Sequence, residues 1–111
     1  GVGLVIDAQS VPIYAETRKL CSVFGLNPWG LIASGALLLA VEPADAENII
    51  GALKRDGIPV TVIGYAKEAA PVVKLRHAGG AEEELTPFAR DEIARLFDEG
   101  QAATARTLHN E

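Results

Sequence analysis

Residues 27–41 read Asn-Pro-Trp-Gly-Leu-Ile-Ala-Ser-Gly-Ala-Leu-Leu-Leu-Ala-Val, and this stretch limits how the rest of the chain can be arranged. Its first part, 27–32, predicts a cap and a short helical turn, because asparagine caps helices and proline fits the first helical position. Ser34 and Gly35 then break that turn. The run 36–41 is apolar at every position, which is typical of a central strand with both faces covered.

The chain before this stretch predicts one strand and one helix. Residues 2–7 read as a strand, and Pro12 starts a helix that runs to about Phe24. Apolar residues at helical spacing mark the inner face of this helix, and Gly25 is a suitable residue to end it. Cys21 lies on the inner face, where we expect a buried and unreactive thiol.

The chain after this stretch predicts two helices and three strands. A helix from Glu42 and Pro43 ends near Gly57, and the β-branched run 58–65 predicts a buried strand. Alternating residues predict a strand over 72–77 with one solvent-exposed face. A turn at Gly79 and Gly80 then leads to a strand at 82–85. The last predicted element is a helix after Pro87, which has Asp91 and Glu92 in its first turn and apolar residues as far as Phe97.

The predicted order is therefore β-α-β-α-β-β-β-α. Helices between buried strands, followed by a meander, indicate an α+β domain with a mixed β-sheet covered by helices. We expect this domain to span residues 1–100, and the polar residues 101–111 to fray or leave it. A helix-rich bundle is the weaker alternative.

Composition excludes several classes of protein. The 111 residues suffice for one domain, and 49% hydrophobic against 23% charged residues exclude a disordered chain. The net charge of -5 argues against a nucleic-acid partner, and no apolar run reaches the roughly 18 residues of a membrane span. One cysteine cannot form an internal disulfide, so we expect a reducing, cytoplasmic compartment. One cysteine and two histidines also make a poor metal set, so we expect no metal. The lack of any methionine predicts one domain of a longer protein, the alternative being an initiator removed ahead of Gly1.

Most catalytic signatures are missing: the sequence has no GxxxxGK[ST], GxGxxG, CxxC, HExxH or GxSxG. His77 and His109 lack sequence neighbours that would complete a triad or a ligand set, and the glutamates at 82–84 read as a solvated edge. Ser34 and Gly35 are the candidate site residues, because a glycine bend admits close approach and turns backbone N–H groups toward an anion. The alternative for this bend is a tight turn without a ligand.

Several segments together resemble the C-terminal domain of the AIR synthase related (PurM-like) superfamily, nearest its hydrogenase-maturation, HypE-like branch. The segments that carry this resemblance are Gly1–Ile6, Val11–Ile13, Phe24–Pro28, Ala33–Leu37, Pro43–Glu47 and Val62–Gly64. The resemblance rests on the order and spacing of these segments, and it covers most of residues 1–97.

The resemblance implies one part of a two-domain enzyme that uses ATP and magnesium. The family's N-terminal domain would supply the metal ligands and most of the nucleotide site, and it would form a homodimer. The present domain would close over the cleft on the side of a small-molecule substrate, with Ser34 and Gly35 facing phosphate. It would bind no cofactor and be inactive alone. The implied reaction activates a substrate oxygen by phosphoryl transfer from ATP.

Two features depart from the HypE-like pattern. Ser34 stands where that branch has an acidic residue, and the sequence ends Leu108-His109-Asn110-Glu111 without the branch's terminal cysteine. We therefore do not expect nitrile synthesis. The second hypothesis is a small α+β module without catalytic activity that binds a metabolite or a protein partner.

Overall fold

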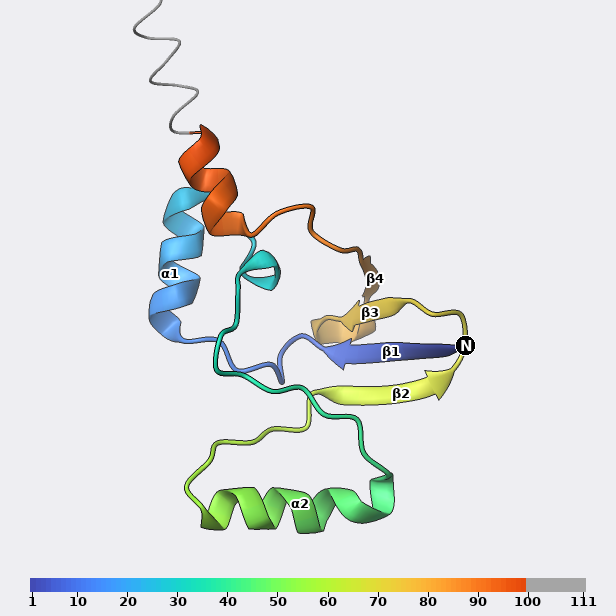
Figure 1. Ribbon diagram of the computed structural model, residues 1–111. Helices are drawn as coiled ribbons and strands as arrows, with labels where there is room; N and C mark the ends of the chain where they lie inside the picture. Colours follow the sequence, from blue (N-terminus) through green and yellow to red (C-terminus); the bar gives the residue numbers. More distant parts are fainter. Residues whose placement is uncertain (100–111) are drawn as a thin grey trace, which may run out of the picture. The chain divides into compact units, whose positions relative to one another are not determined.

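The computed structural model describes residues 1–99, which fall into two compact units (Figure 1). We call them the sheet unit, residues 1–12 and 37–86, and the helical unit, residues 13–36 and 87–99. The predicted tail, 101–111, lies outside the described residues, and the predicted domain of residues 1–100 stays a prediction.

A four-stranded mixed sheet forms the sheet unit, in the order β2-β1-β3-β4. The strands are β1 (Val2–Asp7), β2 (Gly64–Glu68), β3 (Val73–Arg76) and β4 (Glu82–Leu85). β1 pairs antiparallel with β2 and parallel with β3, and β4 pairs antiparallel with β3 (Figure 1). Val5 and Leu75, on the two central strands, are only 2% and 1% exposed. This architecture confirms the predicted α+β fold with a mixed sheet.

Helix α2 (Pro43–Arg55) has the predicted bounds. Pro43 occupies the first turn, where its missing N–H costs nothing, and Asp45 adds a negative charge at the same end. Lys54 and Arg55 lie in the last turn, where positive charge is favourable. Gly57 follows the helix with a φ of 75°, so the chain reverses there at no steric cost.

Two predicted strands differ from the structure. The run 36–41 forms no strand, and the predicted strand 58–65 overlaps the observed β2 only at its last two residues. Leu37 and Leu38 are 82% and 67% exposed, so the run is not covered as predicted. A strand needs a neighbour for its backbone hydrogen bonds, and the run 36–41 pairs with none of the four strands, so its apolar composition alone did not make it a strand. The observed order therefore lacks the second predicted strand.

The helical unit contains α1 (Ala15–Phe24), the short 3-10 helix η1 (Pro28–Gly30) and a helix over residues 92–99. Gly25 ends α1 in the left-handed conformation, with a φ of 65°, as predicted. The side chain of Asn27 caps η1 by accepting the Trp29 backbone N–H at 3.0 Å, which confirms the predicted cap and turn. Cys21 is buried, also as predicted.

Both helices of this unit that the sequence placed after a proline begin later than expected. Tyr14 has an extended backbone, with a ψ of 142°, so α1 begins at Ala15 rather than at Pro12. The last helix begins after Asp91, whose side chain accepts the Ile93 N–H at 3.4 Å. In both cases the proline lies upstream of the helix, and at the last helix the Asp91 side chain caps the start.

Candidate functional site

Ser34 and Gly35, the predicted site residues, form the middle of a tight turn in the helical unit. The Ala36 N–H donates to the Ala33 carbonyl at 3.1 Å, and Gly35 has a φ of 88°, the value that the third position of a type II turn requires. Both residues are exposed, and no atom lies within 4 Å of the place that a Gly35 Cβ would take. The turn is present as predicted, while its contact with phosphate stays a prediction.

A second candidate site lies wholly within the sheet unit. β1 and β3 run parallel and end side by side, at the point where β2 begins, and a hollow of about 440 Å³ opens there. We call it the strand-end hollow. Its polar lining residues are Asp7, Gln9, Tyr65, Arg76 and His77. The carboxyl ends of parallel strands are a common place for ligands in open sheets.

Arg76 is held at one side of the strand-end hollow by two contacts. Its Nη2 donates to the Tyr65 hydroxyl at 3.2 Å and to a carboxylate oxygen of Glu82 at 3.3 Å. The guanidinium also lies 6.0 Å from the centre of the Tyr65 ring. The bonds to Tyr65 and Glu82 raise the pKa of Arg76, so the side chain is a fixed positive charge.

Asp7 faces the same hollow from the neighbouring strand. It is the register partner of Arg76 in the parallel pair, yet among the described residues Arg76 forms its ion pair with Glu82 instead. The Asp7 carboxylate accepts the Gln9 N–H at 3.1 Å and the Ser10 hydroxyl at 2.9 Å, and so fixes the chain where it leaves β1. An acid and a base thus flank the hollow without neutralising each other directly.

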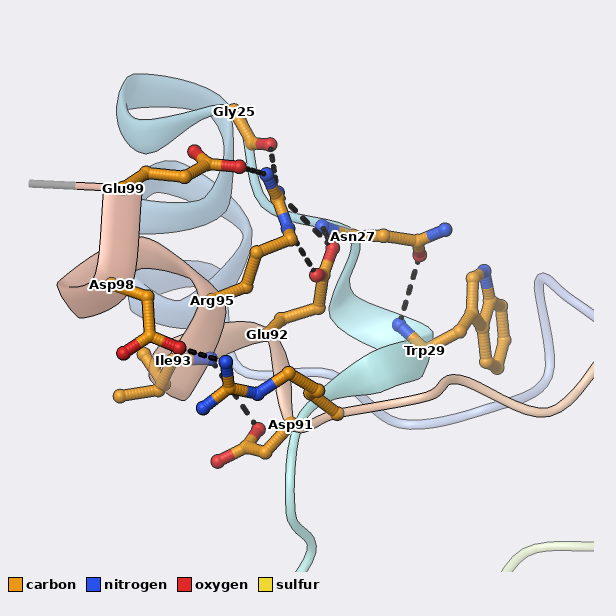
Figure 2. A network of polar contacts seen from close by, with 10 residues as sticks. Gly25, Asn27, Trp29, Asp91, Glu92, Ile93, Arg95, Asp98 and Glu99 are labelled. Atoms are coloured by element: carbon orange, nitrogen blue, oxygen red, sulfur yellow. Dashed lines mark hydrogen bonds and ion pairs between the residues drawn. The ribbon is translucent and has the colours of Figure 1, made fainter. Parts of the chain in front are cut away.

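The helical unit holds a network of polar contacts centred on Glu92 and Arg95 (Figure 2). Glu92 is only 5% exposed; its carboxylate accepts the Asn27 N–H at 2.8 Å and the Arg95 Nε–H at 2.7 Å. Arg95 also donates to the Gly25 carbonyl at 3.1 Å. These bonds lower the pKa of Glu92, the one to Arg95 most, so the network is built around a buried negative charge. It joins the ends of three elements and has a structural role.

Gly30 shows how closely this network is packed. A Cβ on Gly30 would lie 2.6 Å from the Glu92 Cγ and 2.6 Å from the Phe88 ring. Because carbon atoms cannot approach so closely, a side chain at this position would have to displace the Phe88 ring and the Glu92 side chain.

Neither the strand-end hollow nor the buried state of Glu92 was predicted from the sequence. The signal for the hollow was weak: Asp7, Arg76 and His77 each lie at the end of a predicted strand, and polar side chains at such positions can converge when the strands are parallel neighbours. Within residues 1–99, no group of three or more acidic, histidine or cysteine side chains could hold a metal ion. No helix in that range has the length and apolar character to cross a membrane.

Comparison with known proteins gives a family match. Residues 1–75 match the model of the AIR synthase related protein, C-terminal domain. The chain is 30% identical over 99 residues to carbamoyl dehydratase HypE of Rhodobacter capsulatus, which covers 86% of the chain and 29% of that protein. It is 31% identical over 67 residues to a putative hydrogenase expression/formation protein of Methanocaldococcus jannaschii, covering 59% of the chain and 20% of that relative. No solved structure matches the chain.

Proposed function

Because the chain belongs to the AIR synthase related family as a C-terminal domain, we propose that it is the substrate-side domain of a PurM-like, ATP-dependent enzyme. In this proposal the enzyme activates an oxygen atom of a small substrate by phosphoryl transfer from ATP. The observation that carries the proposal is the family match over residues 1–75, together with the likeness to carbamoyl dehydratase HypE. The chain spans only 29% of the length of that relative.

The nucleotide and its magnesium ion are proposed to bind mainly outside this domain. Magnesium is held by carboxylates and phosphate oxygens, and the described residues bring no three acidic side chains together. The described residues therefore do not fit a magnesium site, and we derive no step of the reaction through the metal from them. We propose that an N-terminal domain supplies that site and the homodimer contact, and that the present domain is inactive alone.

The contribution of this domain is proposed to come from the turn at Ser34 and Gly35. A surface that closes over a phosphate needs backbone N–H donors and little side-chain bulk. The exposed turn offers both, since the space beside Gly35 is open and its φ of 88° is one that glycine adopts without strain. Support for this role is the local geometry together with the family to which the chain belongs.

A Gly35→Val variant of the full-length enzyme tests this role. We expect ATP turnover, measured as phosphate release with magnesium and ATP, to fall at least about tenfold, because the side chain would occupy the space proposed for phosphate. Valine at a positive φ also costs roughly 1–2 kcal/mol of stability, so the matched control is Gly57→Val. Gly57 has a φ of 75° and open space around it, but it lies in the sheet unit after α2.

The two glycine variants should lose similar stability and differ in activity. Equal activity in both variants, at equal melting temperatures, would remove Ser34 and Gly35 from the site. A full-length protein that binds no ATP with magnesium would overturn the enzyme proposal itself. The non-catalytic alternative, a metabolite-binding module, is favoured by one observation only, which is the strand-end hollow.

A further inference from the structure

We propose that the strand-end hollow binds a small zwitterion, namely a free amino acid with an apolar side chain. The proposal concerns the sheet unit alone and does not rest on phosphoryl transfer. A hollow of about 440 Å³ lies within the range of small-molecule sites, which is roughly 300–1,000 Å³. It is placed where two parallel strands end together, and its walls come from the ends of β1, β2 and β3 and from the loops that adjoin them.

Arg76 provides the group that would recognise the carboxylate. A guanidinium has five N–H donors, and the contacts to Tyr65 and Glu82 use only Nη2. Among the described residues, Nε and Nη1 have no hydrogen-bond acceptor. A carboxylate can therefore bind at Nη1 while both existing contacts remain, and those contacts hold the guanidinium in place beforehand. Such preorganisation reduces the entropy lost on binding.

Asp7 provides the group that would recognise an ammonium. Each of its carboxylate oxygens accepts one hydrogen bond, from Gln9 or from Ser10, and a carboxylate can accept about four. The unused capacity is on a side chain that lines the hollow and is the register partner of Arg76. The two ends of an amino acid would thus meet opposite charges on adjacent strands.

The local charge balance selects a zwitterion over a phosphate. The Arg76 guanidinium pairs with Glu82, and Asp7, its register partner on β1, also lines the hollow. Two carboxylates beside one guanidinium disfavour a ligand with two negative charges, whereas a zwitterion adds no net charge. An apolar side chain is expected because Val5 and Val62 also line the hollow.

The test is titration of the 111-residue chain with L-leucine, followed by amide chemical shifts in NMR spectra. We expect a Kd on the order of 1 mM, with shifts concentrated at the ends of β1 and β3. Two probes each lack one charge: 4-methylpentanoate has no ammonium, and 3-methylbutylamine has no carboxylate. Each should bind at least about tenfold more weakly than leucine, because one charged hydrogen bond is lost. Inorganic phosphate should not compete.

Variants assign the binding to the two side chains. Arg76→Gln should raise the Kd for leucine at least about tenfold, and Asp7→Asn, which keeps an oxygen for the turn at Gln9, should do the same. The matched control is Lys74→Gln, which removes an equal charge from β3 at a residue that does not line the hollow. The control should bind leucine as the parent chain does, and its spectrum also serves as the reference for folding.

Four results would overturn the proposal: no shifts with leucine, equal binding of 4-methylpentanoate and leucine, shifts that persist in both site variants, or competition by phosphate. Competition by phosphate would identify an anion site instead. None of these results bears on the proposed ATP-dependent reaction, which is measured by phosphate release from the full-length enzyme.

Discussion

Replacing Gly64 with alanine is expected to reduce the free energy of unfolding of the sheet unit by about 3 kcal/mol. Gly64 is the first residue of β2 and is paired with Ile6 in the antiparallel register. A Cβ on Gly64 would overlap the Val5 carbonyl oxygen and lie 3.0 Å from the Ile6 Cα. The atoms that it would meet belong to the backbone of the central strand, which cannot move aside as a flexible side chain could.

The effect should extend beyond the substituted position. The Asp7 N–H donates to the Ile63 carbonyl at 2.7 Å directly beside Gly64, so displacing β2 also breaks this bond. β1 is the strand on which both β2 and β3 depend, and Val5 at its centre is buried. We therefore expect a loss of cooperative stability and a lower denaturation midpoint, measured by urea unfolding with circular dichroism.

Gly51→Ala is the matched control for this prediction. Gly51 lies inside α2 with no atom within 4 Å of the place that an alanine Cβ would take, and alanine is the better helix former. This variant should gain roughly 0.5–1 kcal/mol. If Gly64→Ala unfolded at the same urea concentration as the parent chain, the close approach of β2 to Val5 would not be a constraint on the fold.

Elements with local signals could be predicted from the sequence. Residues 2–7 are rich in β-branched residues, residues 82–85 follow the turn at Gly79 and Gly80, and Pro43 with Gly57 marks both ends of α2; all three elements were predicted with their observed bounds. The prediction of a strand over residues 36–41 was wrong for a different reason. Its apolar composition indicates what a strand would bury, but not whether a neighbouring strand exists to pair with it.

Of the candidate sites, too, the one that depends on local sequence was predicted and the one that depends on strand pairing was not. The turn at Ser34 and Gly35 was predicted because its conformation depends on four consecutive residues. The strand-end hollow depends on the parallel register that places Asp7 opposite Arg76, and nothing within either segment specifies that pairing. Glu92 was expected as a favourable carboxylate in the first turn of a helix; its burial arises from a bond to Asn27, 65 positions away in the sequence.

Glu92→Gln is expected to lower the stability of the helical unit at neutral pH, with a melting temperature reduced by roughly 5 °C. The substitution preserves the size of the side chain but removes the negative charge that accepts the Arg95 Nε–H and the Asn27 N–H. Trp29 is the only tryptophan in the chain, and its backbone N–H is bonded to the Asn27 side chain. Its fluorescence therefore reports on this network directly.

The pH dependence of this effect has a definite sign. The pKa of Glu92 is lowered in the folded state, first by Arg95 and then by the Asn27 N–H, from an ordinary value of 4.5. The charged form is thus favoured by folding, so its stabilisation is complete above pH 4.5 and is lost as the pH falls through the lower, folded-state pKa. The parent chain and Glu92→Gln should differ at pH 7 and converge in acid.

Glu99→Gln is the control that distinguishes the effect of the buried Glu92 charge from the effect of an exposed charge on Arg95. Glu99 also accepts a hydrogen bond from Arg95, at 2.7 Å, but its side chain is 62% exposed, against 7% for Glu92. Water already solvates the Glu99 carboxylate, so removing its charge should change the melting temperature little. Equal losses in the two variants would mean that Arg95 alone requires a negative partner. A loss confined to Glu92→Gln would show that the bond to Asn27, and with it the position of η1, depends on the buried charge.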